Sequence, residues 1–130
     1  MSIHNVLAGV AVLDLDRSLS WYGELLGREP DTRPMPGVAE WSFAGGGWVQ
    51  LFEDHRRAGA SSLTLVESDL AGRLNKLVEK QIRIEEQSES DFVKTAQIRD
   101  PDGNRIVIAE AVSAANKAAA MDENGKAVAV

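Results

Sequence analysis

The stretch Gly103-Asn104-Arg105-Ile106-Val107-Ile108-Ala109-Glu110 repeats the pattern of Gly46-Gly47-Trp48-Val49-Gln50-Leu51-Phe52-Glu53 earlier in the chain. In both stretches glycine leads into a run that is mostly apolar and that ends on glutamate. Upstream, Asp69-Leu70 stands before a helical pattern just as Asp14-Leu15 does. The chain therefore contains one unit twice. A unit of this length cannot bury its apolar side alone, so the two copies are expected to pack together or against a partner and to leave a cavity.

Each copy is predicted to run strand, helix and three strands, from its apolar periodicity and its turn residues. In the first copy these are a strand at 6–13, a helix from Asp14 to Gly27, an edge strand within 27–37 and a hairpin of 40–43 and 48–52. In the second they are a strand at 61–67, a helix capped by Ser68 or Asp69 and running to Lys80, and strands at 82–86, 92–99 and 105–110. Asp100-Pro101-Asp102-Gly103-Asn104 is a strong turn signal.

The composition is that of an ordinary globular protein of 130 residues. A formal net charge of −6 argues against nucleic acid or an anionic membrane as a partner. The absence of cysteine excludes disulfides, a thiol nucleophile and cysteine-based metal sites. No apolar run approaches the roughly 18 residues of a membrane span, and we expect a cytoplasmic protein.

Two motifs carry a family resemblance. They are Val12-Leu13-Asp14-Leu15-Asp16-Arg17-Ser18-Leu19-Ser20-Trp21-Tyr22 and Asp100-Pro101-Asp102-Gly103-Asn104-Arg105-Ile106. With the element order, they make the chain resemble the vicinal oxygen chelate superfamily, which includes glyoxalase I, extradiol dioxygenases, fosfomycin resistance enzymes and bleomycin resistance proteins. The resemblance covers about residues 5–112.

This resemblance implies an α+β fold of two βαβββ modules, about 5–54 and 60–111, that form a curved mixed-sheet cleft. We expect residues 1–112 to make one glyoxalase-like domain, followed by an Ala-rich segment at 113–130 with a helix to Met121 and a loose tail. A homodimer is expected, although the sequence leaves open whether the modules pair within or between chains.

The resemblance also implies where metal ligands would stand. The four matching positions hold Leu7, Gln50, Ser62 and Val107 instead of the usual histidines and glutamates. A divalent metal of this class needs imidazole or carboxylate donors from three or four positions. The sequence therefore predicts no metal and no other cofactor.

Strand alternation places the remaining candidates on one side of the sheets, opposite the apolar side that packs under the helices. This second side mixes aromatic, small and polar residues, which is typical of a ligand pocket. The predicted ligand-binding residues are Trp48, Gln50, Phe52, Ser62, Thr64 and Arg105. The competing interpretation is a half-solvated sheet whose Trp48 and Phe52 fill a dimer seam.

The sequence thus favours a metal-independent small-molecule binding protein that sequesters a cationic or aromatic compound. No catalytic residue is assigned, and three alternatives stay open. One is a metal-dependent lyase, isomerase or dioxygenase with unusual ligands such as Gln50, His55, Glu53 and Glu110. A second is a metal-free enzyme that uses Glu40 or Glu53 as a base. The third is a partner module whose pocket is filled.

Overall fold

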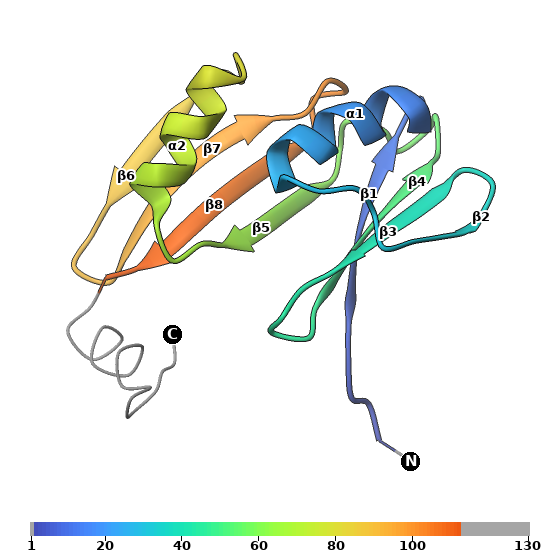
Figure 1. The fold of residues 1–130 in the computed structure, drawn as a ribbon, viewed down its shortest axis with the longest axis horizontal. Helices are drawn as coiled ribbons and strands as arrows, with labels where there is room; N and C mark the ends of the chain where they lie inside the picture. Colours follow the sequence, from blue (N-terminus) through green and yellow to red (C-terminus); the bar gives the residue numbers. More distant parts are fainter. Residues whose placement is uncertain (1, 113–130) are drawn as a thin grey trace. The chain divides into compact units, whose positions relative to one another are not determined.

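The computed structural model describes residues 2–112, and the predicted C-terminal helix and tail lie outside them. The first repeat contains strand β1 (Leu7–Val12), helix α1 (Leu15–Leu26) and strands β2 (Thr32–Met35), β3 (Val38–Ser42) and β4 (Trp48–Glu53). The second contains β5 (Ser62–Val66), α2 (Leu70–Glu79), β6 (Glu86–Glu89), β7 (Val93–Arg99) and β8 (Arg105–Ala111). Figure 1 follows this order along the chain. The predicted α+β fold of two βαβββ repeats is confirmed.

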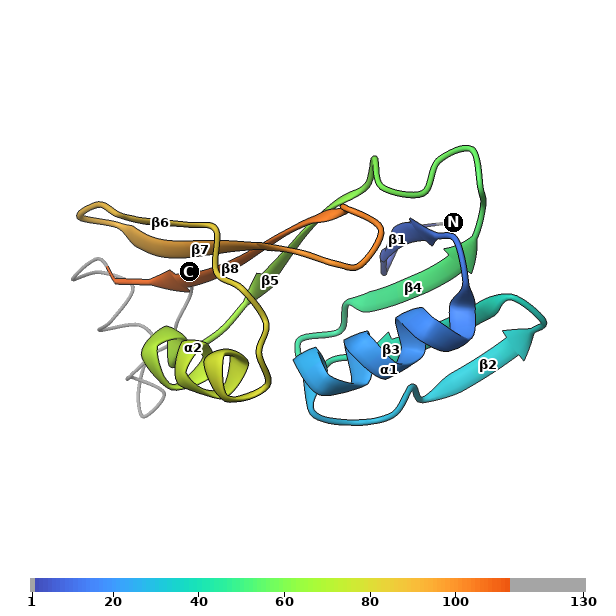
Figure 2. The same ribbon diagram turned by 90° about the horizontal axis from the view of Figure 1, so that it is seen from above.

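Each repeat builds one four-stranded sheet. The strand orders are β1-β4-β3-β2 and β5-β8-β7-β6, so the first strand of each repeat lies at an edge of the sheet and pairs with the last strand of the same repeat. In the first sheet β1 runs parallel to β4, and the other pairs are antiparallel. Figure 2 shows each helix lying against one face of the sheet of its own repeat. One face of each sheet is thus left without a helix.

Both helices begin and end where the sequence predicts. The carboxylates of Asp14 and Asp69 accept hydrogen bonds from the backbone N–H three residues on, which satisfies donors that a helix start leaves unpaired. Helix α1 ends at Gly27, whose φ of 76° is the left-handed conformation that glycine adopts without steric cost. Helix α2 ends at Lys80.

The core of the first repeat lies between α1 and its sheet. Tyr22 and Leu25 of the helix are buried, together with Trp41 of β3 and Leu51 of β4. The Tyr22 and Trp41 rings are 6.3 Å apart. In β4 the buried residues alternate, Val49 and Leu51 being buried, as the predicted assignment of apolar residues to the helix side requires. In β1 the predicted core residues Val10 and Val12 are buried, but Ala11 between them is buried as well.

One predicted strand is displaced. The strand expected at 82–86 is instead β6, Glu86–Glu89, and every residue of β6 is exposed. Ile82 is buried because the chain turns back at the end of α2, where Gln81 has a φ of 63° and the Ile82 N–H donates to the carbonyl of Leu77. Ile82, one of the apolar residues that suggested a strand, is therefore buried at the end of the helix. Strand β6 buries no side chain and is formed by its backbone pairing with β7.

The chain divides into two compact units whose boundary does not follow the repeats. The first unit holds the residues up to Leu63 together with Arg99–Arg105, and the second holds Thr64–Ile98 and the residues from Ile106 onward. The turn between β7 and β8 of the second repeat is thus part of the first unit. Neither helix within residues 2–112 has the length and apolar character to cross a membrane.

Buried polar groups hold this turn in the first unit. The carboxylate of Asp100 accepts hydrogen bonds from the Tyr22 hydroxyl and from the side-chain amide of Asn104, both at 2.8 Å. Asn104 also donates to the carbonyl of Ala11 and accepts from the N–H of Ser61, again at 2.8 Å. Helix α1, strand β1 and the connection to β5 therefore share one hydrogen-bonded network, in which each buried group has a partner.

This network makes a prediction about Tyr22, the only tyrosine in the chain. Burial, the negative charge of Asp100 and their hydrogen bond raise the pKa of the Tyr22 phenol far above its ordinary value of 10.0. Above about pH 10 the unfolded chain binds fewer protons than the folded one, so the free energy of unfolding falls as pH rises, while below that pH the ionisation of Tyr22 has no effect. We expect phenolate absorbance to appear only together with the loss of circular dichroism. Phenolate formation near pH 10 in a chain that keeps its native spectrum would contradict this.

Candidate ligand-binding site

The face of the first sheet turned away from α1, here called the helix-free face, carries three of the predicted site residues. Trp48, Gln50 and Phe52 alternate along β4, so their side chains lie on this same face, and all three are half-buried. Residues two positions apart on one strand are separated by about 7 Å, so the side chains of Trp48 and Phe52 lie on either side of the Gln50 side chain along β4.

A polar row crosses the helix-free face through Gln50. Strand register places Gly9 of β1 and Glu40 of β3 on either side of Gln50, and Thr32 of β2 beyond Glu40. The side-chain amide of Gln50 donates to one carboxylate oxygen of Glu40 at 2.7 Å, and the Thr32 hydroxyl donates to the other at 3.3 Å. The row thus presents a carboxylate held by two neutral donors.

Phe52 leans over the glycine end of this row. A Cβ atom placed on Gly9 would lie 3.1 Å from Cε1 of the Phe52 ring, which is closer than carbon atoms normally approach. The absence of a side chain at Gly9 therefore lets the ring lie over strand β1. Leu7, the residue opposite Trp48 on the same face, is 52% exposed and adds apolar surface there.

The other three predicted residues lie on the second sheet. Ser62 and Thr64 are exposed at alternate positions of β5, and Arg105 is exposed at the start of β8. The Arg105 guanidinium lies 3.5 Å from the Ser62 hydroxyl oxygen, at the long limit for a hydrogen bond. The structure thus groups Trp48, Gln50 and Phe52, and it brings Arg105 to Ser62, with Thr64 two residues further along β5.

Glu53 and Glu110, which match across the repeat, have one and the same structural role. Glu53 Oε2 accepts a hydrogen bond from the N–H of Leu15 at 2.9 Å, and Glu110 Oε1 accepts one from the N–H of Leu70 at 2.8 Å. Each carboxylate therefore stabilises the first turn of its own helix, where unpaired N–H groups and the helix dipole favour negative charge. This geometry explains why the sequence repeats a glutamate at the end of both strands.

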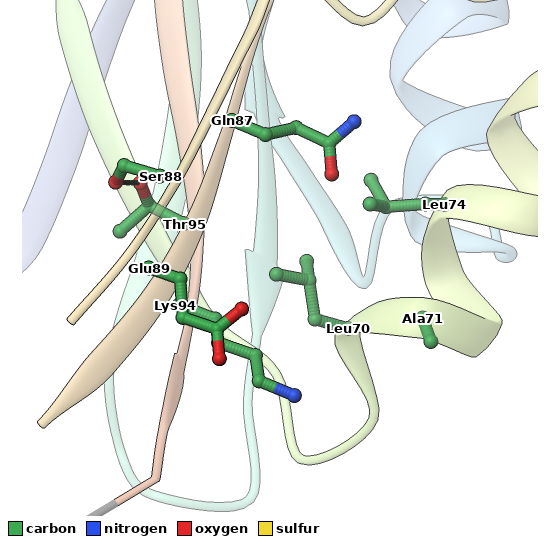
Figure 3. Close-up of a pocket in the computed structure, with 8 residues that line it drawn as sticks. All are labelled: Leu70, Ala71, Leu74, Gln87, Ser88, Glu89, Lys94 and Thr95. Atoms are coloured by element: carbon green, nitrogen blue, oxygen red, sulfur yellow. Dashed lines mark hydrogen bonds between the residues drawn. The ribbon is translucent and has the colours of Figure 1, made fainter. Parts of the chain in front are cut away.

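A separate groove of about 360 Å³ lies within the second unit, between α2 and strands β6 and β7. Figure 3 shows Leu70 and Leu74 of the helix on one side and Gln87 reaching toward Leu74 from the edge strand. Ser88 and Thr95 are hydrogen-bonded to each other across β6 and β7. None of the six residues predicted from the sequence lines this groove.

Comparison with known proteins agrees with the fold and the repeat. The family model for the Glyoxalase/Bleomycin resistance protein/Dioxygenase superfamily matches residues 2–108. The chain belongs to this superfamily. Among curated proteins, no match to the chain was found.

Solved structures with the same fold superimpose on most of the chain. A glyoxalase/bleomycin resistance protein from Catenulispora acidiphila is 33% identical, with a TM-score of 0.76 over 83% of this chain and 98% of that chain. TnmS3, an antibiotic binding protein from Streptomyces sp. CB03234, is 22% identical, with a TM-score of 0.74 over 85% and 98%. The oxidase ChaP-H2 is 15% identical, with a TM-score of 0.71 over 88% and 98%. Proteins with different activities therefore share this fold.

The residues present do not fit the metal ion that the superfamily's enzymes imply. Leu7 and Val107 offer no donor atom, Ser62 offers a neutral hydroxyl, and Gln50 offers a neutral amide oxygen. Within residues 2–112 no three histidine, aspartate or glutamate side chains are grouped as a metal site requires. This donor set is too poor for a divalent ion, which takes three or four imidazole or carboxylate ligands.

Sequence analysis did not single out Thr32, and it considered Glu40 as a possible base or as a salt-bridge partner of Arg105. Alternation from Gln50 fixes which residues of β4 share a face, but the partner of Gln50 on β3 depends on the length of the turn between the strands. Three glycines at 45–47 allow several turn lengths. The observed hydrogen bond from the Phe43 N–H to the Gly47 carbonyl selects the register in which Glu40 faces Gln50.

The role of Glu53 makes a testable prediction. Replacing Glu53 by alanine removes the acceptor for the Leu15 N–H, and we expect the free energy of unfolding to fall by about 1 kcal/mol, as for loss of a helix cap. Urea denaturation measures this loss, and Glu29→Ala, at an exposed residue, is the control with the same change in charge. A Glu53→Ala protein as stable as the Glu29→Ala control would contradict the assignment.

Proposed function

We propose that this protein binds an organic small molecule on the helix-free face without a metal ion and sequesters a cationic or aromatic compound. The observation that carries the proposal is the pairing of aromatic side chains with a fixed polar row on the helix-free face. Trp48 and Phe52 supply flat apolar surface, and Gln50 and Glu40 supply directed polar groups. Small-molecule sites combine these two features.

The comparison with TnmS3 supports the same class of function, since that protein is described as antibiotic binding and has the same fold. In the proposal Trp48, Gln50 and Phe52 of β4 contact the ligand, and Ser62, Thr64 and Arg105 remain predicted ligand-binding residues on the second sheet. We also propose that the protein acts as a homodimer, which analytical ultracentrifugation would test directly.

Metal independence is tested by calorimetric titration of chelator-treated, untagged protein with Ni²⁺, Zn²⁺, Mn²⁺ and Fe²⁺. We expect no saturable binding, because the donor set lacks imidazole and the carboxylates of Glu53 and Glu110 are engaged at helix starts. Gln50→Glu is a useful companion variant, because one added carboxylate still leaves too few ligands. Saturable binding near one ion per chain in the original protein would overturn the proposal and favour a metal-dependent enzyme.

Ligand binding is tested with a planar cationic dye, proflavine, followed by fluorescence polarisation. We expect Trp48→Ala to weaken proflavine binding about tenfold, because an aromatic contact contributes on the order of 1 kcal/mol beyond its buried area. Phe92→Ala is the matched control, since Phe92 is an aromatic residue that is 68% exposed on the second unit. Equal weakening by the two variants would place the binding site elsewhere.

A further inference from the structure

Glu40 lies near the centre of the helix-free face and is half-buried there. Each of its carboxylate oxygens accepts one hydrogen bond from a side chain, one from Gln50 and one from Thr32. A carboxylate oxygen has room for a further donor beyond one such bond. The side chain is therefore oriented by its neighbours and still able to accept hydrogen bonds from a ligand.

The two donors that hold Glu40 are neutral. Within residues 2–112 the ion pairs involve other acidic residues, and none includes Glu40. The register partners of Glu40 and of its neighbours on this face are uncharged. Glu40 is therefore the one carboxylate among these register-paired residues, while the Asp31 carboxylate, which accepts a hydrogen bond from the Ser42 hydroxyl of the same face, is ion-paired with Arg28.

Aromatic rings flank the Glu40 carboxylate. Trp48 and Phe52 stand in the rows before and after the Gln50–Glu40 row, within the reach of diagonal cross-strand neighbours. Apolar surroundings strengthen the attraction between opposite charges, and the face of an aromatic ring also attracts a cation. The arrangement suits an organic ammonium group, which needs acceptors and ring faces instead of a complete coordination shell.

We propose that the Glu40 carboxylate accepts the ammonium group of the bound compound, so that the helix-free face selects protonated aromatic amines. The inference rests on the proposed function and adds the ligand's charged group and the residue that recognises it.

The test uses three probes that share one ring system and differ in charge: tryptamine, N-acetyltryptamine and indole-3-propionate. Chemical-shift changes of backbone amides in the full chain detect even weak binding and locate it. We expect tryptamine to bind about tenfold more tightly than neutral N-acetyltryptamine, the ratio that one charge-assisted hydrogen bond provides, and indole-3-propionate to bind most weakly. Salt should weaken tryptamine binding and leave N-acetyltryptamine binding unchanged.

The variant Glu40→Gln keeps the size of the side chain and removes its charge. We expect it to abolish the preference for tryptamine while leaving the affinity for N-acetyltryptamine intact. Glu29→Gln, at an exposed residue outside this face, is the control with the same change in net charge. Because the selectivity of the unaltered chain is measured first, the test does not depend on whether the variant folds.

The outcomes separate this inference from the function on which it rests. If all three probes bind at β4 with equal affinity, or if Glu40→Gln weakens them equally, the role of Glu40 is overturned while ligand binding stands. If no probe and no proflavine shifts the amides of β4, the proposed function fails, and the inference fails with it.

Discussion

The structure depends first on a buried carboxylate. Asp100 is 4% exposed, and it is accommodated away from water because the Tyr22 hydroxyl and Asn104 donate hydrogen bonds to it. A buried charge without such partners would cost several kcal/mol. The conformation of the turn after β7 therefore requires the side chains of Asp100 and Asn104, because shortening either of them would leave buried donors and acceptors without hydrogen-bond partners. Through Ala11 and Ser61 the same network fixes strand β1 and the start of the second repeat.

The two repeats share the same order of strands and helix, but the residues on the faces of their sheets without a helix differ. In both, an aspartate begins the helix, and a glutamate at the end of the central strand accepts the N–H of the first helical residue. On the helix-free face of the first sheet the central strand carries Trp48, Gln50 and Phe52, whereas β8 carries Arg105 and Val107 at the matching places. The residues that begin the helices and stabilise their first turns therefore recur in both repeats, whereas the residues on the face without a helix differ between them.

The helix-free face carries Leu7 and Gln50 where the superfamily resemblance implies metal ligands. Strand pairing holds the neighbouring side chains of this face in fixed rows. Glu40 is one strand away from Gln50, and its carboxylate is oriented by hydrogen bonds from both adjacent strands. Rigid strands suit such a site because they hold polar groups in place before a ligand arrives.

The sequence by itself determined the repeat, the order of the elements, the cap of the first helix and which residues of β4 share a face, because these follow from local periodicity and from side chains that bond within a few residues. For the second helix it left the cap open between Ser68 and Asp69, and the structure shows Asp69 in that role. Tertiary structure decided the rest. The burial of Ile82 against the end of α2 displaced β6 toward Glu86, and the turn at Gly45–Gly47 set the register that joins Glu40 to Gln50. The partners of Glu53 and Glu110 are likewise distant in sequence. Such contacts depend on how strands and helices meet in space, which residue spacing along the chain does not specify.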